Sequence, residues 1–102
     1  MVNSDFDAVI ISSLDIYDGN VTLTNVYVNI DEIKIMQSDS NFTIEFLAIY
    51  HFNDTNKTII KTDVLTETST TNHFTSTTNM FSTAKTILET YLTGLSLIYT
   101  DA

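Results

Sequence analysis

Few side chains in this 102-residue sequence are suited to chemistry, and its two histidines are the first to consider. They are His51 and His73, and the chain contains no cysteine. Zinc sites combine several Cys, His or acidic ligands at short spacing, and neither histidine has such neighbours. We therefore expect no metal site and no cofactor. Both histidines are interpreted as surface or edge residues of the fold.

Acidic side chains around Gly19 resemble part of a calcium-binding loop. Such a loop places ligands at its first, third and fifth positions and glycine at its sixth. Counted back from Gly19, the first and third positions are Leu14 and Ile16, which carry no oxygen ligand. The acids Asp15 and Asp18 are better explained by a tight turn.

Other arrangements of catalytic or binding residues are also missing from the sequence. Two glycines cannot form a glycine-rich phosphate loop, and nothing in the sequence suggests a basic partner, held by a third group, for a Ser or Thr nucleophile. Thirteen acids against four scattered lysines give a net charge of −9, so there is no basic patch for phosphates. These observations predict a protein that is not an enzyme, has no catalytic residues and binds no nucleic acid.

Composition indicates one folded, non-membrane domain over residues 1–102. A hydrophobic fraction of 43%, with six Phe and five Tyr, is too high for a disordered chain. No apolar run approaches the roughly 20 residues of a membrane helix. The first residues are acidic and lack the basic segment of a secretory signal. We expect a protein made in the cytoplasm that contacts no membrane.

The dipeptide Asp18-Gly19 predicts a β-hairpin, because a type I′ turn needs positive φ at both central residues. The flanking strands are expected at about 8–17 and 20–36. One side of this ribbon is apolar and the other polar, so turn chemistry and hydrophobic pattern select the same register. The predicted pairs are Tyr17–Asn20, Ile16–Val21, Leu14–Leu23, Asp15–Thr22 and Ser13–Thr24.

In the second strand the apolar residues change sides near Asp31-Glu32. This change indicates either a β-bulge or a strand buried on both faces. A four-residue loop over 38–41, followed by a strand over 42–52, sets Lys34 opposite Glu45. We expect this register, and no bulge. The other predicted pairs are Ile35–Ile44, Ile33–Phe46 and Ile30–Ile49.

The rest of the chain predicts one more strand and a helix. A fourth strand is expected at about 57–66, with a register ambiguous by one residue, followed by a Thr-rich connection over 67–79. The period then changes to 3.6, which predicts an amphipathic helix over about 80–93 packed on the sheet. Residues 95–102 form either a short strand or an extended tail. The expected class is α+β: a small antiparallel sheet of about four hairpin-connected strands with one C-terminal helix.

Several segments, taken in this order, resemble those of a known group of proteins. They are the turn Asp18-Gly19-Asn20, the strand Val26–Ile30, the start Ser40–Ile44 of a long strand, and Ala84 with Glu89–Leu92 in the helix. The chain resembles, over about residues 14 to 95, the small uncharacterised virion-associated proteins encoded among the tail genes of tailed bacteriophages. It departs from them in having Asn29 in place of a Lys, Met36–Asp39 in place of a Gly-x-Lys turn, and no proline before the helix.

The resemblance implies a structural virion component assembled in the host cytoplasm. It would be a small adaptor or ring-forming subunit of the tail or neck that contacts other virion proteins and copies of itself. The alternatives are a capsid decoration protein, or a soluble acidic module that modulates a host protein. Exposed strand edges are where partner chains add by strand pairing. The candidate interface residues are Thr68, Thr71, His73, Phe74, Leu97 and Tyr99.

Overall fold

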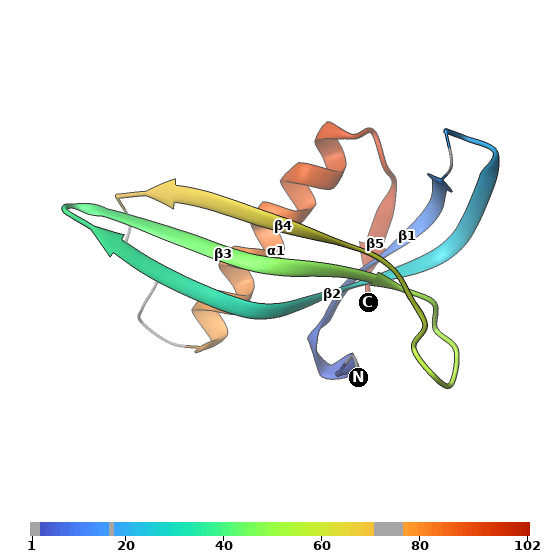
Figure 1. The fold of residues 1–102 in the computed structure, drawn as a ribbon, viewed down its shortest axis with the longest axis horizontal. Coiled ribbons are helices and arrows are strands. Elements are labelled where there is room, and N and C mark those ends of the chain that lie inside the picture. Colours follow the sequence, from blue (N-terminus) through green and yellow to red (C-terminus); the bar gives the residue numbers. More distant parts are fainter. Residues whose placement is uncertain (1–2, 17, 71–76) are drawn as a thin grey trace.

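The described part of the chain forms one antiparallel sheet with an 18-residue helix packed against one face (Figure 1). The computed structural model describes residues 3–16, 18–70 and 77–102. The α+β class predicted from the sequence is confirmed, with a short fifth strand added to the four main ones. The strands lie in the order β4-β3-β2-β1-β5. In chain order the elements are η1 (Ser4–Phe6), β1 (Asp7–Ile16), β2 (Val21–Ser38), β3 (Asn41–His51), β4 (Ile59–Ser69), α1 (Thr77–Gly94) and β5 (Tyr99–Asp101).

The first hairpin has the predicted register. Asp18 and Gly19 have φ values of 56° and 85°, as a type I′ turn requires. On the polar side of the ribbon, Thr22 Oγ1 donates a hydrogen bond of 2.6 Å to Asp15 Oδ1. Four of the predicted pairs are present: Ile16–Val21, Leu14–Leu23, Asp15–Thr22 and Ser13–Thr24. Tyr17, predicted to pair with Asn20, lies outside the described residues.

The second hairpin has the predicted register near its turn, but the expected loop over 38–41 is wrong, because β2 continues to Ser38 and β3 begins at Asn41. Beyond the turn the predicted register is also wrong. Lys34 pairs with Glu45, and the chain reverses at residues 39–40. The expectation that β2 has no bulge is wrong, because the register shifts between Asp31 and Lys34 and Glu32 has a φ of 50°. The extra residue keeps apolar side chains on the helix side before and after the shift. As a result Ile30 pairs with Ala48 rather than Ile49.

The second half of the chain differs from the prediction mainly at its boundaries. β4 continues to Ser69, so residues 67–69 belong to the strand rather than to the Thr-rich connection, and α1 already begins at Thr77. The ambiguous register of β4 is resolved by the pair Phe46–Leu65. The C-terminal residues add β5 beside β1, so the tail pairs within its own chain.

The hydrophobic core lies between the sheet and α1, which is behind the sheet in Figure 1. Ala84, Leu88 and Leu92 are one helical turn apart, lie on one side of α1 and have no exposed surface. They face β2, β3 and β4, on which most of α1 packs. The fully buried sheet residues of this core are Val9, Ile11, Val26, Val28, Ile44, Phe46, Ala48 and Tyr50.

Candidate protein interface

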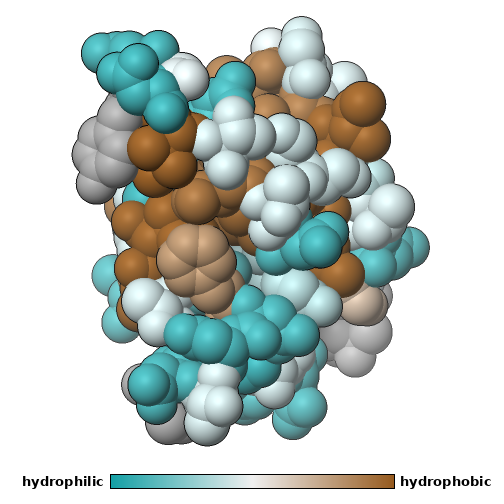
Figure 2. All heavy atoms as spheres, turned by 90° about the vertical axis from the view of Figure 1, so that its right-hand side faces the viewer, coloured by the Kyte–Doolittle hydropathy of each residue, from teal (hydrophilic) through white to brown (hydrophobic). Residues whose placement is uncertain are grey.

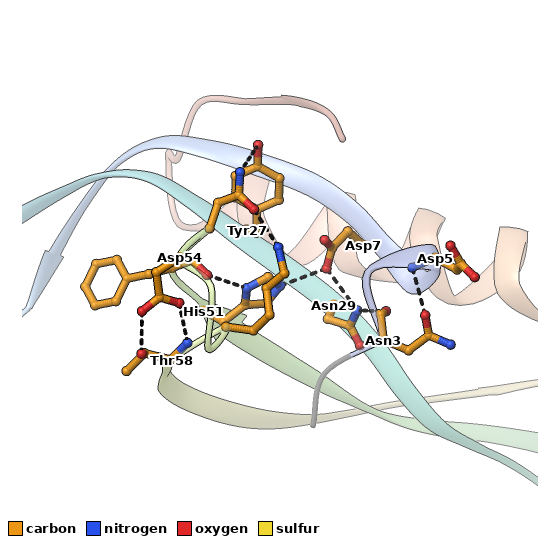
Figure 3. Close-up of polar contacts among 11 residues, drawn as sticks. Asn3, Asp5, Asp7, Tyr27, Asn29, His51, Asp54 and Thr58 are labelled. Atoms are coloured by element: carbon orange, nitrogen blue, oxygen red, sulfur yellow. Dashed lines mark hydrogen bonds and ion pairs between the residues drawn. The ribbon is translucent and has the colours of Figure 1, made fainter.

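A buried polar cluster joins the N-terminal segment to β2 and β3 (Figure 3). The side chain of His51 is 0% exposed, and its Nε2 lies 2.8 Å from Oδ1 of Asp7. Its Nδ1 donates a 2.8 Å hydrogen bond to the carbonyl of Phe52. Asn29, also buried, donates from Nδ2 to Asp7 Oδ1 at 2.9 Å and to the Asn3 carbonyl at 2.7 Å. The cluster therefore ties β1, β2 and β3 together on the face away from α1.

The interpretation of His51 as a surface or edge residue is wrong. Its strand lies between β4 and β2, and Tyr27, its neighbour on β2, places a ring 5.8 Å from the imidazole. The imidazole can be buried because both ring nitrogens have partners. Asp7 precedes His51 by 44 residues, so nothing in the local sequence marks the pairing. His73 lies outside the described residues.

The Asp7–His51 pair resembles part of a catalytic triad, but its geometry does not suit catalysis. In a triad the carboxylate orients the histidine and the other ring nitrogen faces a nucleophile. In this chain the other nitrogen is bonded to the carbonyl of Phe52, and the ring has no exposed surface. Neither nitrogen can exchange a proton with a substrate in this arrangement. The cluster therefore holds strands together.

A second polar group is buried where β3 and β4 meet the helix side of the sheet. Tyr50 is 0% exposed, and its hydroxyl has no hydrogen-bond partner among the described residues. Lys61 Nζ lies 4.5 Å from the centroid of that ring and 3.5 Å from Asp63 Oδ2. Burial raises the pKa of the Tyr50 phenol far above its usual range, and the Asp63 carboxylate and the Tyr91 phenol raise it further. Tyr50 therefore stays neutral, and it contributes a ring on which Lys61 lies.

The loop between β3 and β4 is closed by one carboxylate (Figure 3). Asp54 Oδ2 accepts from Thr58 Oγ1 at 2.6 Å, and its Oδ1 accepts from the Thr58 backbone N–H at 2.8 Å. The Thr58 hydroxyl, followed by that N–H, holds the pKa of Asp54 below its usual value. Lys57 has a φ of 50° and donates from Nζ to Asn53 Oδ1 at 2.7 Å. These bonds fix where β4 starts beside β3.

β4 forms one edge of the sheet. It pairs with β3 along its whole length, and no described strand pairs with its other side. The only register shift in this pairing lies near its start, so the strand is regular from Lys61 onwards. Strand residues alternately direct their backbone N–H and C=O groups to either side. The groups that β4 directs outward are those to which a strand of another chain can bind.

The side chains of β4 also suit strand pairing. Thr62, Val64 and Thr66 point away from the helix side, and Val64 is 59% exposed. β-branched residues of this kind favour a pleated surface. Charged side chains on an edge normally oppose strand addition. On β4, however, Lys61 Nζ lies 3.5 Å from Asp63 Oδ2, so these two opposite charges neutralise each other.

The structure separates the predicted interface residues into three groups. Thr68 lies on β4, is exposed, and has its Oγ1 2.9 Å from Thr43 Oγ1. Leu97 and Tyr99 are partly buried and pack against the core; Tyr99 begins β5, at the other edge of the sheet, and Leu97 lies just before it. The three remaining residues, Thr71, His73 and Phe74, lie outside the described residues. Val64 could not be identified from the sequence, because the face on which it lies depends on the register of β4.

Exposed apolar side chains also gather at the end of the molecule that carries the first hairpin. Figure 2 shows this end, with hydrophobic side chains in its upper half above a hydrophilic lower half. Val21 in β2 and the segment after α1 contribute to the exposed apolar surface of the chain: Val21 is 40%, Leu95 50% and Ile98 73% exposed. This region has no strand edge as long as that of β4.

In the described part of the chain, no group of three His, Cys, Asp or Glu side chains is placed to hold a metal ion. Of the helical residues described, none belong to a helix that is long and apolar enough to cross a lipid bilayer. Comparison of the chain with protein-family models, curated proteins and solved structures found no match in any of the three.

Proposed function

We propose that this chain is a structural subunit that acts by protein–protein contact through the edge of β4. The observation that carries this proposal is an 11-residue edge strand with an exposed valine, Val64, in its middle. Addition of a strand to such an edge gives affinity through backbone hydrogen bonds and specificity through alternate side chains. The enclosed Asp7–His51 pair supports a structural rather than a catalytic role.

The resemblance to virion-associated proteins of tailed phages suggests where this contact is made. We propose a small adaptor or ring-forming subunit of the tail or neck, whose partners are other virion proteins and copies of itself. Closed symmetry presents the same surface patch many times, so one type of edge contact serves every copy of the subunit. A particle of this kind covers the free edge of β4, which in a lone monomer is exposed to aggregation.

Incorporation into phage particles tests this proposal. Val64→Lys adds a charge on the edge of β4 at a side chain that is 59% exposed, so the core is left intact. Mass spectrometry should detect the tagged wild-type chain in purified particles and should not detect the Val64→Lys chain. Val21→Lys, the same change at a 40% exposed valine of β2, is the matched control and should be incorporated. Equal incorporation of the two lysine variants, or absence of the wild-type chain, would refute the proposal.

A further inference from the structure

We infer that β4 pairs in antiparallel fashion with β4 of a second copy of this chain, about a two-fold axis at Val64. This inference rests on the proposed function, because it names the partner of the same edge. The resulting dimer has one continuous sheet of ten strands, five from each copy. The axis is perpendicular to the sheet, so both α1 helices lie on the same face.

Backbone geometry restricts how two β4 strands can meet. Only alternate residues of β4 direct their N–H and C=O groups outward, since the others bond to β3. In an antiparallel pair, a residue whose backbone groups point outward must lie opposite another such residue. When both edges are β4, each residue therefore pairs with one an even number of positions away, and the two-fold axis passes between one residue and its own copy. Val64 is the residue midway between Ile59 and Ser69, so an axis there gives the longest overlap.

Charge selects the same axis. An axis at Asp63 sets that carboxylate against its own copy, and an axis at Leu65 sets Asp63 against Glu67. Like charges placed directly opposite are destabilising. An axis at Val64 sets Lys61 of each copy opposite Glu67 of the other, which gives two symmetric ion pairs. An axis at Thr62 also pairs opposite charges, Lys61 with Asp63, but overlaps only Ile59–Leu65.

The side chains that meet under this register are accessible. Lys61 is 41% exposed, and Glu67 is exposed at the rim of a cleft of about 270 Å³ between β4 and α1. On the other face, Leu47 of β3 lies beside Val64. Pairing Val64 with its own copy extends this apolar row across the junction and covers a side chain that is 59% exposed in the monomer. Thr62 meets Thr66 on each side of the axis.

Disulfide trapping tests the axis directly, because the chain contains no cysteine. Opposed residues of antiparallel strands have Cα atoms about 4.5–5.5 Å apart, within the range that a disulfide spans. Val64→Cys alone should form a disulfide-linked dimer under mild oxidation. Thr62→Cys alone and Thr66→Cys alone should not, whereas an equal mixture of these two variants should. A dimer of Thr62→Cys or Thr66→Cys alone that forms as fast as that of Val64→Cys, or no dimer of Val64→Cys, overturns the inference.

A charge exchange tests the ion pairs on the intact protein. Glu67→Lys sets lysine against lysine at both ends of the junction and should weaken the dimer by about tenfold in Kd, measured by sedimentation equilibrium at about 0.15 M NaCl, where a Debye length of about 8 Å screens the accompanying change in net charge. The double variant Lys61→Glu/Glu67→Lys restores opposite charges and should return Kd to within about threefold of the wild type. Equal weakening by the single and double variants overturns the register.

These results separate the two proposals. If Val64→Cys gives no dimer but Val64→Lys still excludes the chain from particles, the edge binds a different protein and only the self-pairing fails. If Val64→Lys is incorporated like the wild type, the proposed function of the β4 edge fails as well.

Discussion

His51 is held inside the fold by partners for both of its ring nitrogens. The Phe52 carbonyl can only accept a hydrogen bond, so Nδ1 donates to it. The other ring nitrogen, Nε2, is therefore the one that bonds to Asp7. Asn29 supplies a further donor to the same carboxylate oxygen. Removing one member leaves a buried polar group without its partner, which costs roughly 1–3 kcal/mol and more when the group is charged. The three side chains therefore act as one unit.

A double-mutant cycle on Asp7 and His51 should show this coupling. We expect Asp7→Ala and His51→Ala each to lower the free energy of unfolding by about 3 kcal/mol. The double variant should lose at least about 1 kcal/mol less than the sum, because directly bonded residues are not additive. Urea denaturation at pH 7 measures all four proteins. Asp5→Ala, an exposed acid in η1, is the control and should change stability by less than about 0.5 kcal/mol. Strict additivity would contradict the coupling.

The Tyr50 hydroxyl predicts a loss of stability at high pH. Its pKa in the folded chain is raised above the usual 10.0 by burial, then by Asp63 and Tyr91. A group whose pKa is raised on folding contributes stability below its unfolded pKa, and this contribution is lost as the pH rises above 10.0. Tyr50→Phe should leave stability at pH 7 within about 1 kcal/mol, because the hydroxyl has no hydrogen-bond partner to lose.

Denaturation of this variant between neutral pH and about pH 10.5 measures the effect, and its alkaline loss should be smaller than that of the wild type. Tyr99→Phe, which removes the hydroxyl of a partly buried tyrosine of β5, is the control for the loss of a tyrosine hydroxyl. An unchanged alkaline loss in Tyr50→Phe would show that other groups cause it.

At the scale of the elements, two residues with a left-handed backbone conformation keep the apolar side chains of β2 on the core side. Asn25 and Glu32 have φ values of 54° and 50°. Between them, the even-numbered residues of Val26–Ile30 are buried in the core, while beyond them Leu23 and Ile33 pack against the same core. Each left-handed residue thus shifts the alternation of the strand by one position. This shift lets a strand of 18 residues follow a twisted sheet beside one helix.

Glycine should have opposite effects at two nearby positions of β2. A left-handed conformation costs a non-glycine residue about 1–2 kcal/mol, so Glu32→Gly should raise the free energy of unfolding by up to about 1 kcal/mol after the entropy of glycine is subtracted. Lys34 pairs with Glu45 in the regular ladder, so Lys34→Gly should lower the free energy of unfolding by about 1 kcal/mol. Urea denaturation of both variants measures the sign of each change in the free energy of unfolding. Equal destabilisation by the two variants would contradict a left-handed bulge at Glu32.

The features that could be predicted from the sequence are those set by neighbours in the chain. Asp18-Gly19 carries its own turn preference, and Lys34 opposite Glu45 follows from matching two adjacent strands. The bulge could not be predicted, because Glu32, unlike Gly or Asn, has no preference for positive φ. Burial of His51 depends on a residue 44 positions earlier. The free edge of β4 emerges only from the order of all the strands.

At the scale of the whole molecule, the net charge of −9 opposes the proposed dimer. Two charges of −9 separated by 27 Å, the middle extent of the molecule, repel by roughly 5 kcal/mol at 0.01 M ionic strength and by about 1 kcal/mol at 0.1 M. The two Lys61–Glu67 pairs together contribute at most about 2 kcal/mol, which salt also weakens. The overall repulsion is therefore the larger salt-dependent term.

Added salt should therefore strengthen the dimer although its contact contains ion pairs. We expect Kd to fall at least about tenfold between 0.01 M and 0.1 M NaCl at pH 7, measured by sedimentation equilibrium. The double variant Lys61→Glu/Glu67→Lys keeps the net charge and should show the same slope. A Kd that rises with salt would mean that the local ion pairs dominate, and the charge exchange would then weaken or restore the dimer mainly at low salt. A Kd that falls with added salt in both proteins would instead show that repulsion between the net negative charges of the two copies weakens the dimer at low salt.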